Sequence, residues 1–158
     1  MGLEYDTKRS GLIIRKFLPQ DAQALMAIAQ ESPEAASWSL ESYLKLSAER
    51  GSVALIAENG AETSGFLIGR GVADQAEVLN LAVRRNVRRR GQGTALLAAA
   101  LREFGLQDVR SVYLEVRESN TGAIAFYECH GFTKTDLRKA YYRNPDESAI
   151  TMEKKLTV

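Results

Sequence analysis

Short apolar runs alternate with amphipathic segments along this chain, and the two patterns have different periods. Mostly apolar runs that are bounded by glycine or polar residues are typical of β-strands. Segments in which apolar side chains recur every three or four residues are typical of helices with one buried face. The pattern predicts strands at residues 12–17, 53–57, 65–69, 77–83, 112–116 and about 148–153, and a further strand that opens at Phe132.

Capping residues and glycines predict four helices among these strands. This mixture of strand and helix indicates an α/β or α+β fold with a central mixed sheet. The first helix begins at Pro19 and Asp21, the second has Ser39 as its N-cap and ends at Gly51, the third follows Gly93 and ends near Gly105, and the fourth is capped by Ser119 or Asn120 and runs through Tyr127.

Size and composition limit the class of protein. A chain of 158 residues suits one domain, which we place at residues 11–158, after a disordered N-terminal lead-in at residues 1–10. The net charge of +1 argues against binding of nucleic acid by the molecule as a whole. Cys129 is the only cysteine, which excludes an intrachain disulfide. No apolar run approaches the roughly 20 residues of a membrane span, and no signal peptide is visible, so a cytoplasmic protein without membrane attachment is expected.

The positive charge is concentrated in one loop between a predicted strand and a predicted helix. Five arginines lie between Arg84 and Arg90, and the sequence Gly91-Gln92-Gly93 opens an alanine- and leucine-rich helix. Free N–H groups and the helix dipole favour an anion at a helix start. Glycine lets the backbone approach a phosphate closely, and arginine adds charge. The loop therefore predicts a site for a phosphate-bearing cofactor.

Several motifs together resemble the GNAT family of acetyl-CoA-dependent N-acyltransferases. The loop matches the family's Q/R-x-x-G-x-G/A pyrophosphate motif at residues 88–93, and residues 114–120, 123–127 and 131–132 resemble its RimI-like subgroup more specifically. The resemblance covers about residues 12–156. It implies a mixed, mostly antiparallel sheet that is splayed at the acetyl-CoA site and flanked by about four helices. It also implies acetyl transfer to a protein N-terminal amine, which in that subgroup belongs to a ribosomal protein.

Two residues are the catalytic candidates. Transfer to an amine needs the amine neutral, and a positioned carboxylate can take its proton. Glu115 lies in a predicted strand on the face opposite Leu114 and Val116, and the resemblance makes it the base; the alternative is a solvated strand glutamate. Tyr127 can donate a proton to the leaving thiolate, which is the role that the resemblance implies. A core aromatic is its alternative, and both can hold, because a tyrosine can bury its ring and expose its hydroxyl.

The resemblance also implies the binding residues. The backbone of the strand before the loop pairs with the pantetheine arm, and the N–H of Val83 donates to the thioester oxygen. No metal is expected, because histidine and cysteine are too few to form a cluster. Cofactor-binding candidates are Leu81, Ala82, Val83, Arg88, Arg89, Arg90, Gly91, Gln92, Gly93, Thr94 and Asn120, and acceptor-binding candidates are Trp38, Tyr141 and Tyr142.

Three other functions are compatible with parts of the pattern. The same fold can acetylate a small-molecule amine, and the basic loop can serve an RNA- or ribosome-binding module. A CoA-binding protein without catalysis is a third alternative, against which the presence of both Glu115 and Tyr127 argues. Asn120 and Trp38 also have structural alternatives, as a helix cap and as a core plug. Arg84 and Arg85 replace an acidic-proline pair that is common in the family, which makes the loop more basic.

Overall fold

A single eight-stranded sheet organises the molecule in the computed structural model, which describes residues 5–7, 11–32, 35–143 and 146–157. The strand order is β1-β2-β3-β4-β5-β6-β8-β7, and all neighbours are antiparallel except β5 and β6. The strands are β1 (Tyr5–Thr7), β2 (Leu12–Lys16), β3 (Ser52–Asn59), β4 (Glu62–Val72), β5 (Gln75–Val83), β6 (Ser111–Arg117), β7 (Thr133–Tyr142) and β8 (Glu147–Lys155).

Four α-helices and two short 3₁₀ turns connect the strands. Ser39 accepts a hydrogen bond from the Ser42 N–H at the start of the second helix, as predicted. Asn120, rather than Ser119, caps the fourth helix by accepting from the Ala123 N–H at 3.1 Å. The helical elements are η1 (Pro19–Asp21), α1 (Ala22–Gln30), α2 (Leu40–Ala48), η2 (Arg85–Val87), α3 (Gln92–Leu106) and α4 (Thr121–Cys129).

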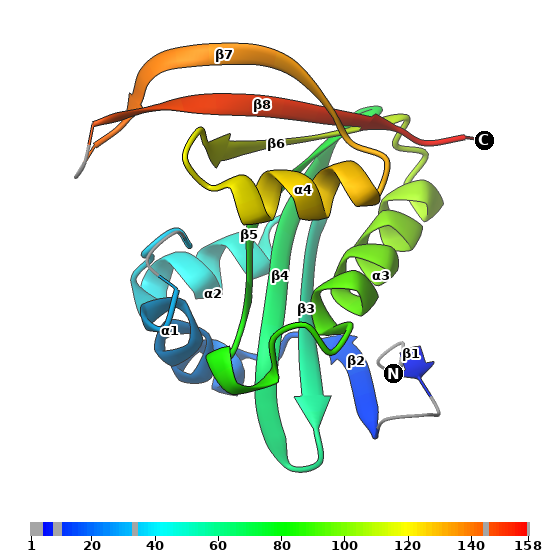
Figure 1. The fold of residues 1–158 in the computed structure, drawn as a ribbon. Helices are drawn as coiled ribbons and strands as arrows, with labels where there is room; N and C mark the ends of the chain where they lie inside the picture. Colours follow the sequence, from blue (N-terminus) through cyan, green and yellow to red (C-terminus); the bar gives the residue numbers. More distant parts are fainter. Residues whose placement is uncertain (1–4, 8–10, 33–34, 144–145, 158) are drawn as a thin grey trace.

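Each face of the sheet carries its own hydrophobic core. On one face Leu67, Leu97 and Tyr127 belong to a cluster with the apolar residues of α3 and α4. On the other face Ile56 and Phe66 pack against the apolar residues of α1 and α2. Figure 1 shows α1 and α2 on one side of β3, β4 and β5, and α3 on the other. Alternate residues of one strand therefore face two different compartments.

The sheet opens between β5 and β6. These strands pair in parallel over three positions only, ending at Glu77 opposite Tyr113, although both strands continue beyond that point. In the pairing of β5 with β4, Ile68 faces Asn80 and Gly69 faces Val78, so Leu79 is an extra residue in β5. A bulge of this kind bends a strand and increases its twist. In Figure 1, β5 runs away from β6 after their shared beginning, which agrees with the predicted splay.

The N-terminal expectation needs a correction for three residues. Tyr5–Thr7 form β1, which pairs antiparallel with β2, so the predicted lead-in contains a strand. The pairing satisfies backbone groups at the edge of β2, a contribution that does not depend on an apolar pattern. Residues 1–4 and 8–10 lie outside the described residues. Among the helices that the structure describes, none is long and apolar enough to cross a membrane.

Candidate active site

The gap between β5 and β6 exposes backbone groups of β5. The Arg84 N–H donates to the Ser64 oxygen of β4 at 2.7 Å. Hydrogen bonds alternate along an antiparallel pair, so Ala82 also directs its N–H and C=O toward β4. Leu81 and Val83 then direct theirs away from β4, toward the gap. Two of the three predicted strand positions thus offer main-chain donors and acceptors to an extended ligand.

The first turn of α3 presents main-chain N–H groups that have no side-chain cap. Gly91 is its N-cap with φ of +79°, a left-handed conformation that favours glycine, and no side chain caps the helix. The Ala95 N–H bonds the Gly91 oxygen at 3.0 Å, which is the first helical bond. The N–H groups of Gln92, Gly93 and Thr94 are therefore left for a ligand. An added Cβ at Gly91 meets no atom within 4 Å, so the space before this turn is open.

Two side chains of this turn have structural partners. Gln92 is buried, and its amide oxygen accepts a 2.6 Å hydrogen bond from Ser64 of β4. The Thr94 hydroxyl lies 3.1 Å from Nε2 of His130, which follows α4. Gln92 can therefore contact a cofactor only through its backbone, because its side chain fixes the helix start to the sheet.

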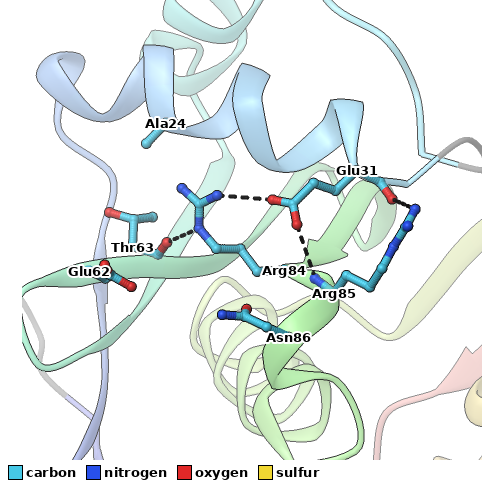
Figure 2. Close-up of a pocket in the computed structure, with 7 residues that line it drawn as sticks. All are labelled: Ala24, Glu31, Glu62, Thr63, Arg84, Arg85 and Asn86. Carbon is cyan, nitrogen blue, oxygen red and sulfur yellow. Dashed lines mark hydrogen bonds and ion pairs between the residues drawn. The ribbon is translucent and has the colours of Figure 1, made fainter.

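Three arginines of the loop are engaged with the end of α1. Glu31 accepts from Arg84 Nη1 at 2.9 Å and from the Arg85 N–H at 3.3 Å, and Arg85 Nη2 donates to the Glu31 carbonyl at 3.1 Å (Figure 2). Arg88 donates to the Val83 carbonyl at 3.3 Å and to the Ser32 hydroxyl. The three arginines therefore hold α1 against the loop.

One cleft and the two remaining arginines complete the surroundings of the loop. A cleft of about 820 Å³ lies beside Glu31, Arg84 and Arg85 but is lined by neither catalytic candidate. Arg89 and Arg90 are exposed, and no hydrogen bond or ion pair is recorded for either side chain within the described part of the chain. Their charges are therefore available to a phosphate, whereas the guanidinium of Arg88 already has partners.

Glu115 lies on the α1 and α2 face of the sheet. Its neighbours Leu114 and Val116 are buried in the opposite core, and Glu115 alternates with them along β6. Its carboxylate accepts from Arg138 Nη1 of β7 at 2.7 Å, and interaction with this carboxylate raises the pKa of the Tyr141 hydroxyl. Glu115 is thus a fixed, ion-paired carboxylate in a cleft and not a freely solvated one.

Tyr127 lies on the other face of β6, within the α3 and α4 core. Its ring packs edge-on against Phe126 and Phe132, with centroid separations of 5.2 and 5.5 Å. Burial raises the pKa of Tyr127, and the nearby Tyr142 raises it further. Burial, followed by the charge of Glu115, raises the pKa of Tyr142 to about 12. The two catalytic candidates thus lie on opposite faces of the sheet, and Tyr142 is close enough to raise the pKa of Tyr127 and to be affected by the charge of Glu115.

This opposed arrangement suits a displacement reaction. Transfer of an acyl group to an amine removes a proton from the attacking nitrogen and delivers one to the leaving sulfur, so a base and an acid can divide the two proton transfers between them. A carboxylate on the α1 face and a phenol on the α3 face provide such a pair.

The three acceptor-binding candidates differ in their surroundings. Tyr141 is exposed, and its ring lies under the Arg138 guanidinium with 5.2 Å between them, while Arg117 lies 4.5 Å above Tyr142. Both tyrosines therefore border the Glu115 side of β7. Trp38 packs against Tyr43 at 5.2 Å between ring centroids and is partly buried beside the α1 and α2 core, which agrees with the core-plug alternative.

Two polar residues of β5 escaped the sequence analysis. Asn80 is buried at the bulge and donates to the Ala36 carbonyl at 3.1 Å, which ties the α1–α2 connection to β5. Glu77 lines a cleft of about 610 Å³ together with Glu115 and Arg138. A polar residue at the position of Asn80, inside an apolar run, was the available signal for the first. Nothing local distinguishes Glu77 from a solvated glutamate.

Comparison with known proteins decides the family. Residues 22–132 match the acetyltransferase (GNAT) family. The chain belongs to this family. Its predicted fold and its predicted class, an N-acetyltransferase, are thereby confirmed, and GNAT acetyltransferases use acetyl-CoA as the acetyl donor.

Three similar proteins and structures are each named as a ribosomal-protein alanine N-acetyltransferase. The [ribosomal protein bS18]-alanine N-acetyltransferase of Escherichia coli K12 is 35% identical over 125 residues, which cover 78% of this chain and 84% of that protein. The protein of the same name from Haemophilus influenzae is 32% identical over 143 residues, or 89% and 96% of the two chains. The crystal structure of the E. coli ribosomal-protein-S18-alanine N-acetyltransferase matches with a TM-score of 0.83 and 30% identity, covering 93% of this chain and 95% of that one.

Proposed function

We propose that this GNAT acetyltransferase acetylates the α-amine of a protein N-terminus, and that the N-terminal alanine of ribosomal protein bS18 is its acceptor. The names of relatives that cover most of both chains support this acceptor. The observation that carries the assignment of the site is the opening of the sheet between β5 and β6, with an uncapped helix start on one face and a fixed carboxylate on the other.

Binding of acetyl-CoA is assigned to the α3 face. The cosubstrate supplies an acetyl thioester, and its diphosphate fits the N–H groups of Gln92, Gly93 and Thr94 with the charges of Arg89 and Arg90. The N–H and C=O groups of Leu81 and Val83 pair with the amides of the pantetheine arm, as an added strand would. The Val83 N–H then donates to the carbonyl oxygen of the acetyl group as negative charge develops there.

Proton transfers are assigned to the two catalytic candidates. The α-ammonium enters from the α1 face, where Glu115 attracts it and a carboxylate removes its proton. On the other face the Tyr127 hydroxyl donates to the sulfur as the carbon–sulfur bond breaks. Burial keeps Tyr127 protonated, because it raises a pKa that is already about 10 in water. Asn120, which caps α4, keeps its structural role with or without a cofactor contact.

A peptide assay tests this function. The purified protein is incubated with acetyl-CoA and a synthetic peptide that carries a free N-terminal alanine, and CoA release is followed together with the peptide mass. We expect a mass gain of one acetyl group on the α-amine, and no gain on the same peptide with a blocked N-terminus. Acetylation of a small amine such as a polyamine, without reaction of the peptide, would instead establish the small-molecule alternative.

A further inference from the structure

His130 links the end of α4 to the first turn of α3. Its Nδ1 lies 2.7 Å from the Phe126 carbonyl oxygen, and its Nε2 lies 3.1 Å from the Thr94 hydroxyl. Its backbone N–H donates to the Tyr127 carbonyl at 3.0 Å, and Lys154 of β8 donates to the His130 carbonyl at 2.8 Å. The ring is therefore held between the helix that carries Tyr127 and the turn that is assigned to the diphosphate.

The partners of the ring decide where its hydrogen lies. A carbonyl oxygen can only accept, so Nδ1 of His130 carries the hydrogen that bonds to Phe126. In a neutral imidazole Nε2 then has no hydrogen, and it accepts the hydrogen of the Thr94 hydroxyl. While His130 is neutral, the single hydroxyl hydrogen of Thr94 is therefore directed to the ring.

A bound diphosphate changes the hydrogen bond that Thr94 can make. The Thr94 N–H belongs to the uncapped first turn of α3, and the residue is exposed. Phosphate oxygens only accept, so a Thr94 hydroxyl that contacts one of them has to donate its hydrogen. Only a protonated ring can then keep its contact with Thr94 Oγ1, because both nitrogens of an imidazolium donate.

We propose that binding of acetyl-CoA is coupled to the uptake of one proton by His130. In the complex the Thr94 hydroxyl donates to a diphosphate oxygen, and Nε2 of His130 donates to the Thr94 oxygen. The proton comes from solvent and forms the Nε2–H bond, and no bond of the cofactor breaks. This inference rests on the proposed function. His130 acts through Thr94 and is therefore a positioning residue of the cofactor site.

The charges around the ring act in both directions. Lys154 of β8, whose ammonium bonds the His130 carbonyl, disfavours a positive ring. Arg89 and Arg90, in the loop before α3, act in the same direction, whereas Glu128, an exposed residue of α4, favours the positive ring. A bound diphosphate adds negative charge beside Thr94, one hydroxyl away from the ring. Because an imidazole changes its charge near neutral pH, the coupling operates in the physiological range.

Nuclear magnetic resonance of the wild type tests the proposal directly. His130 is the only histidine of the chain, so its ring signals are unambiguous. The labelled protein is titrated from about pH 5 to about pH 9, alone and saturated with CoA. We expect the tautomer with a hydrogen on Nδ1 in the free protein at high pH. With CoA bound, the midpoint of the ring titration should lie higher by about one pH unit or more.

Two substitutions and a matched control locate the coupling. His130→Gln keeps a side chain that can form hydrogen bonds but cannot titrate, and Thr94→Val keeps the shape but removes the hydroxyl. The control Thr135→Val makes the same change at an exposed threonine of β7. Calorimetric titration with CoA at about pH 7, in two buffers of different ionisation enthalpy, counts the protons taken up on binding.

The variants should differ in their proton counts. The wild type and Thr135→Val take up more protons per CoA than His130→Gln and Thr94→Val, and any contribution from the phosphates of CoA cancels in this comparison. The wild type holds its proton more tightly in the complex, so its affinity is highest at low pH and falls as the pH rises. Between about pH 5.5 and about pH 8.5 its Kd should rise about tenfold more than that of His130→Gln, because one pH unit in a titration midpoint is a tenfold factor in affinity.

Other results would overturn the proposal. A ring titration with the same midpoint in the free and the CoA-bound wild type would exclude proton uptake by His130, and this measurement needs no variant. Full proton uptake by Thr94→Val would exclude the link through the Thr94 hydroxyl. Failure of the proposed function is distinguishable, because a wild type that acetylates no peptide N-terminus can still show proton-coupled binding of CoA.

Discussion

Three successive arginines, Arg88, Arg89 and Arg90, precede Gly91, yet their side chains have different surroundings. Arg88 reaches back to the Val83 carbonyl at 3.3 Å, to the Glu31 carbonyl at 3.4 Å and to the Ser32 hydroxyl. Arg89 and Arg90 extend into solvent. We therefore expect single substitutions to glutamine to separate structural from phosphate-binding charge within one loop.

The expected magnitudes follow from these contacts. Arg88→Gln removes three partly exposed hydrogen bonds worth about 0.5 kcal/mol each, so it should lower the free energy of unfolding by about 1–2 kcal/mol. For a domain of this size the melting temperature then falls by about 2–8 °C. Arg89→Gln and Arg90→Gln leave stability unchanged. Each removes one charge near a diphosphate in a largely aqueous setting, and each raises the Kd for acetyl-CoA about three- to tenfold at low salt.

Calorimetric titration with acetyl-CoA and thermal unfolding of the free protein measure both effects. Repetition at high salt is the control, because screening shrinks the affinity differences of Arg89→Gln and Arg90→Gln but not the stability difference of Arg88→Gln. The reasoning is refuted when Arg88→Gln weakens acetyl-CoA binding as strongly as the other two variants while its melting temperature stays at the wild-type value.

Three further substitutions test other parts of the account. Tyr127→Phe keeps the buried ring and should lower kcat about 10²-fold with little change in the KM for acetyl-CoA; steady-state rates at wild-type level would remove the proton-donor role. Ser64→Ala leaves the buried amide oxygen of Gln92 without its donor and should cost about 1–3 kcal/mol in urea unfolding; an unchanged midpoint would contradict this. Gly51→Ala places a Cβ within 2.2 Å of the Gly71 oxygen, at a residue whose φ is +82°. We therefore expect the free energy of unfolding to fall by about 2 kcal/mol or more. A urea unfolding midpoint at or above the wild-type value would show that the chain relaxes around the added Cβ.

Local signals predicted most of the helices and strands. The caps Ser39 and Asn120 act within a few residues of themselves, and both lie where the sequence predicts a helix start. The helix α3 begins at Gln92, two residues earlier than expected, because Gly91 rather than Gly93 is its N-cap. The β1 strand was missed because three residues at a sheet edge carry no periodic pattern. Its formation depends on the exposed edge of β2, which a local pattern does not describe.

The site was predictable to a smaller extent. The anion-binding turn follows from glycine and helix chemistry, whereas the roles of Glu115 and Tyr127 came from a family resemblance and remain proposals. The different situations of Arg88 and Arg89 could not be predicted, because they depend on the end of α1, which is distant in sequence. Glu77 and Glu115 belong to strands whose parallel contact ends after three pairs, and that divergence is a property of the assembled sheet.

Titration of the ¹⁵N-labelled protein with CoA, followed by the backbone amide resonances, tests the central claim most directly. The account predicts large, saturable shifts for Gln92, Gly93 and Thr94 at the start of α3 and for Leu81 and Val83 along the gap, with Ala82 shifting less because its N–H faces β4. Saturable CoA binding that left all of these amides unperturbed would contradict it.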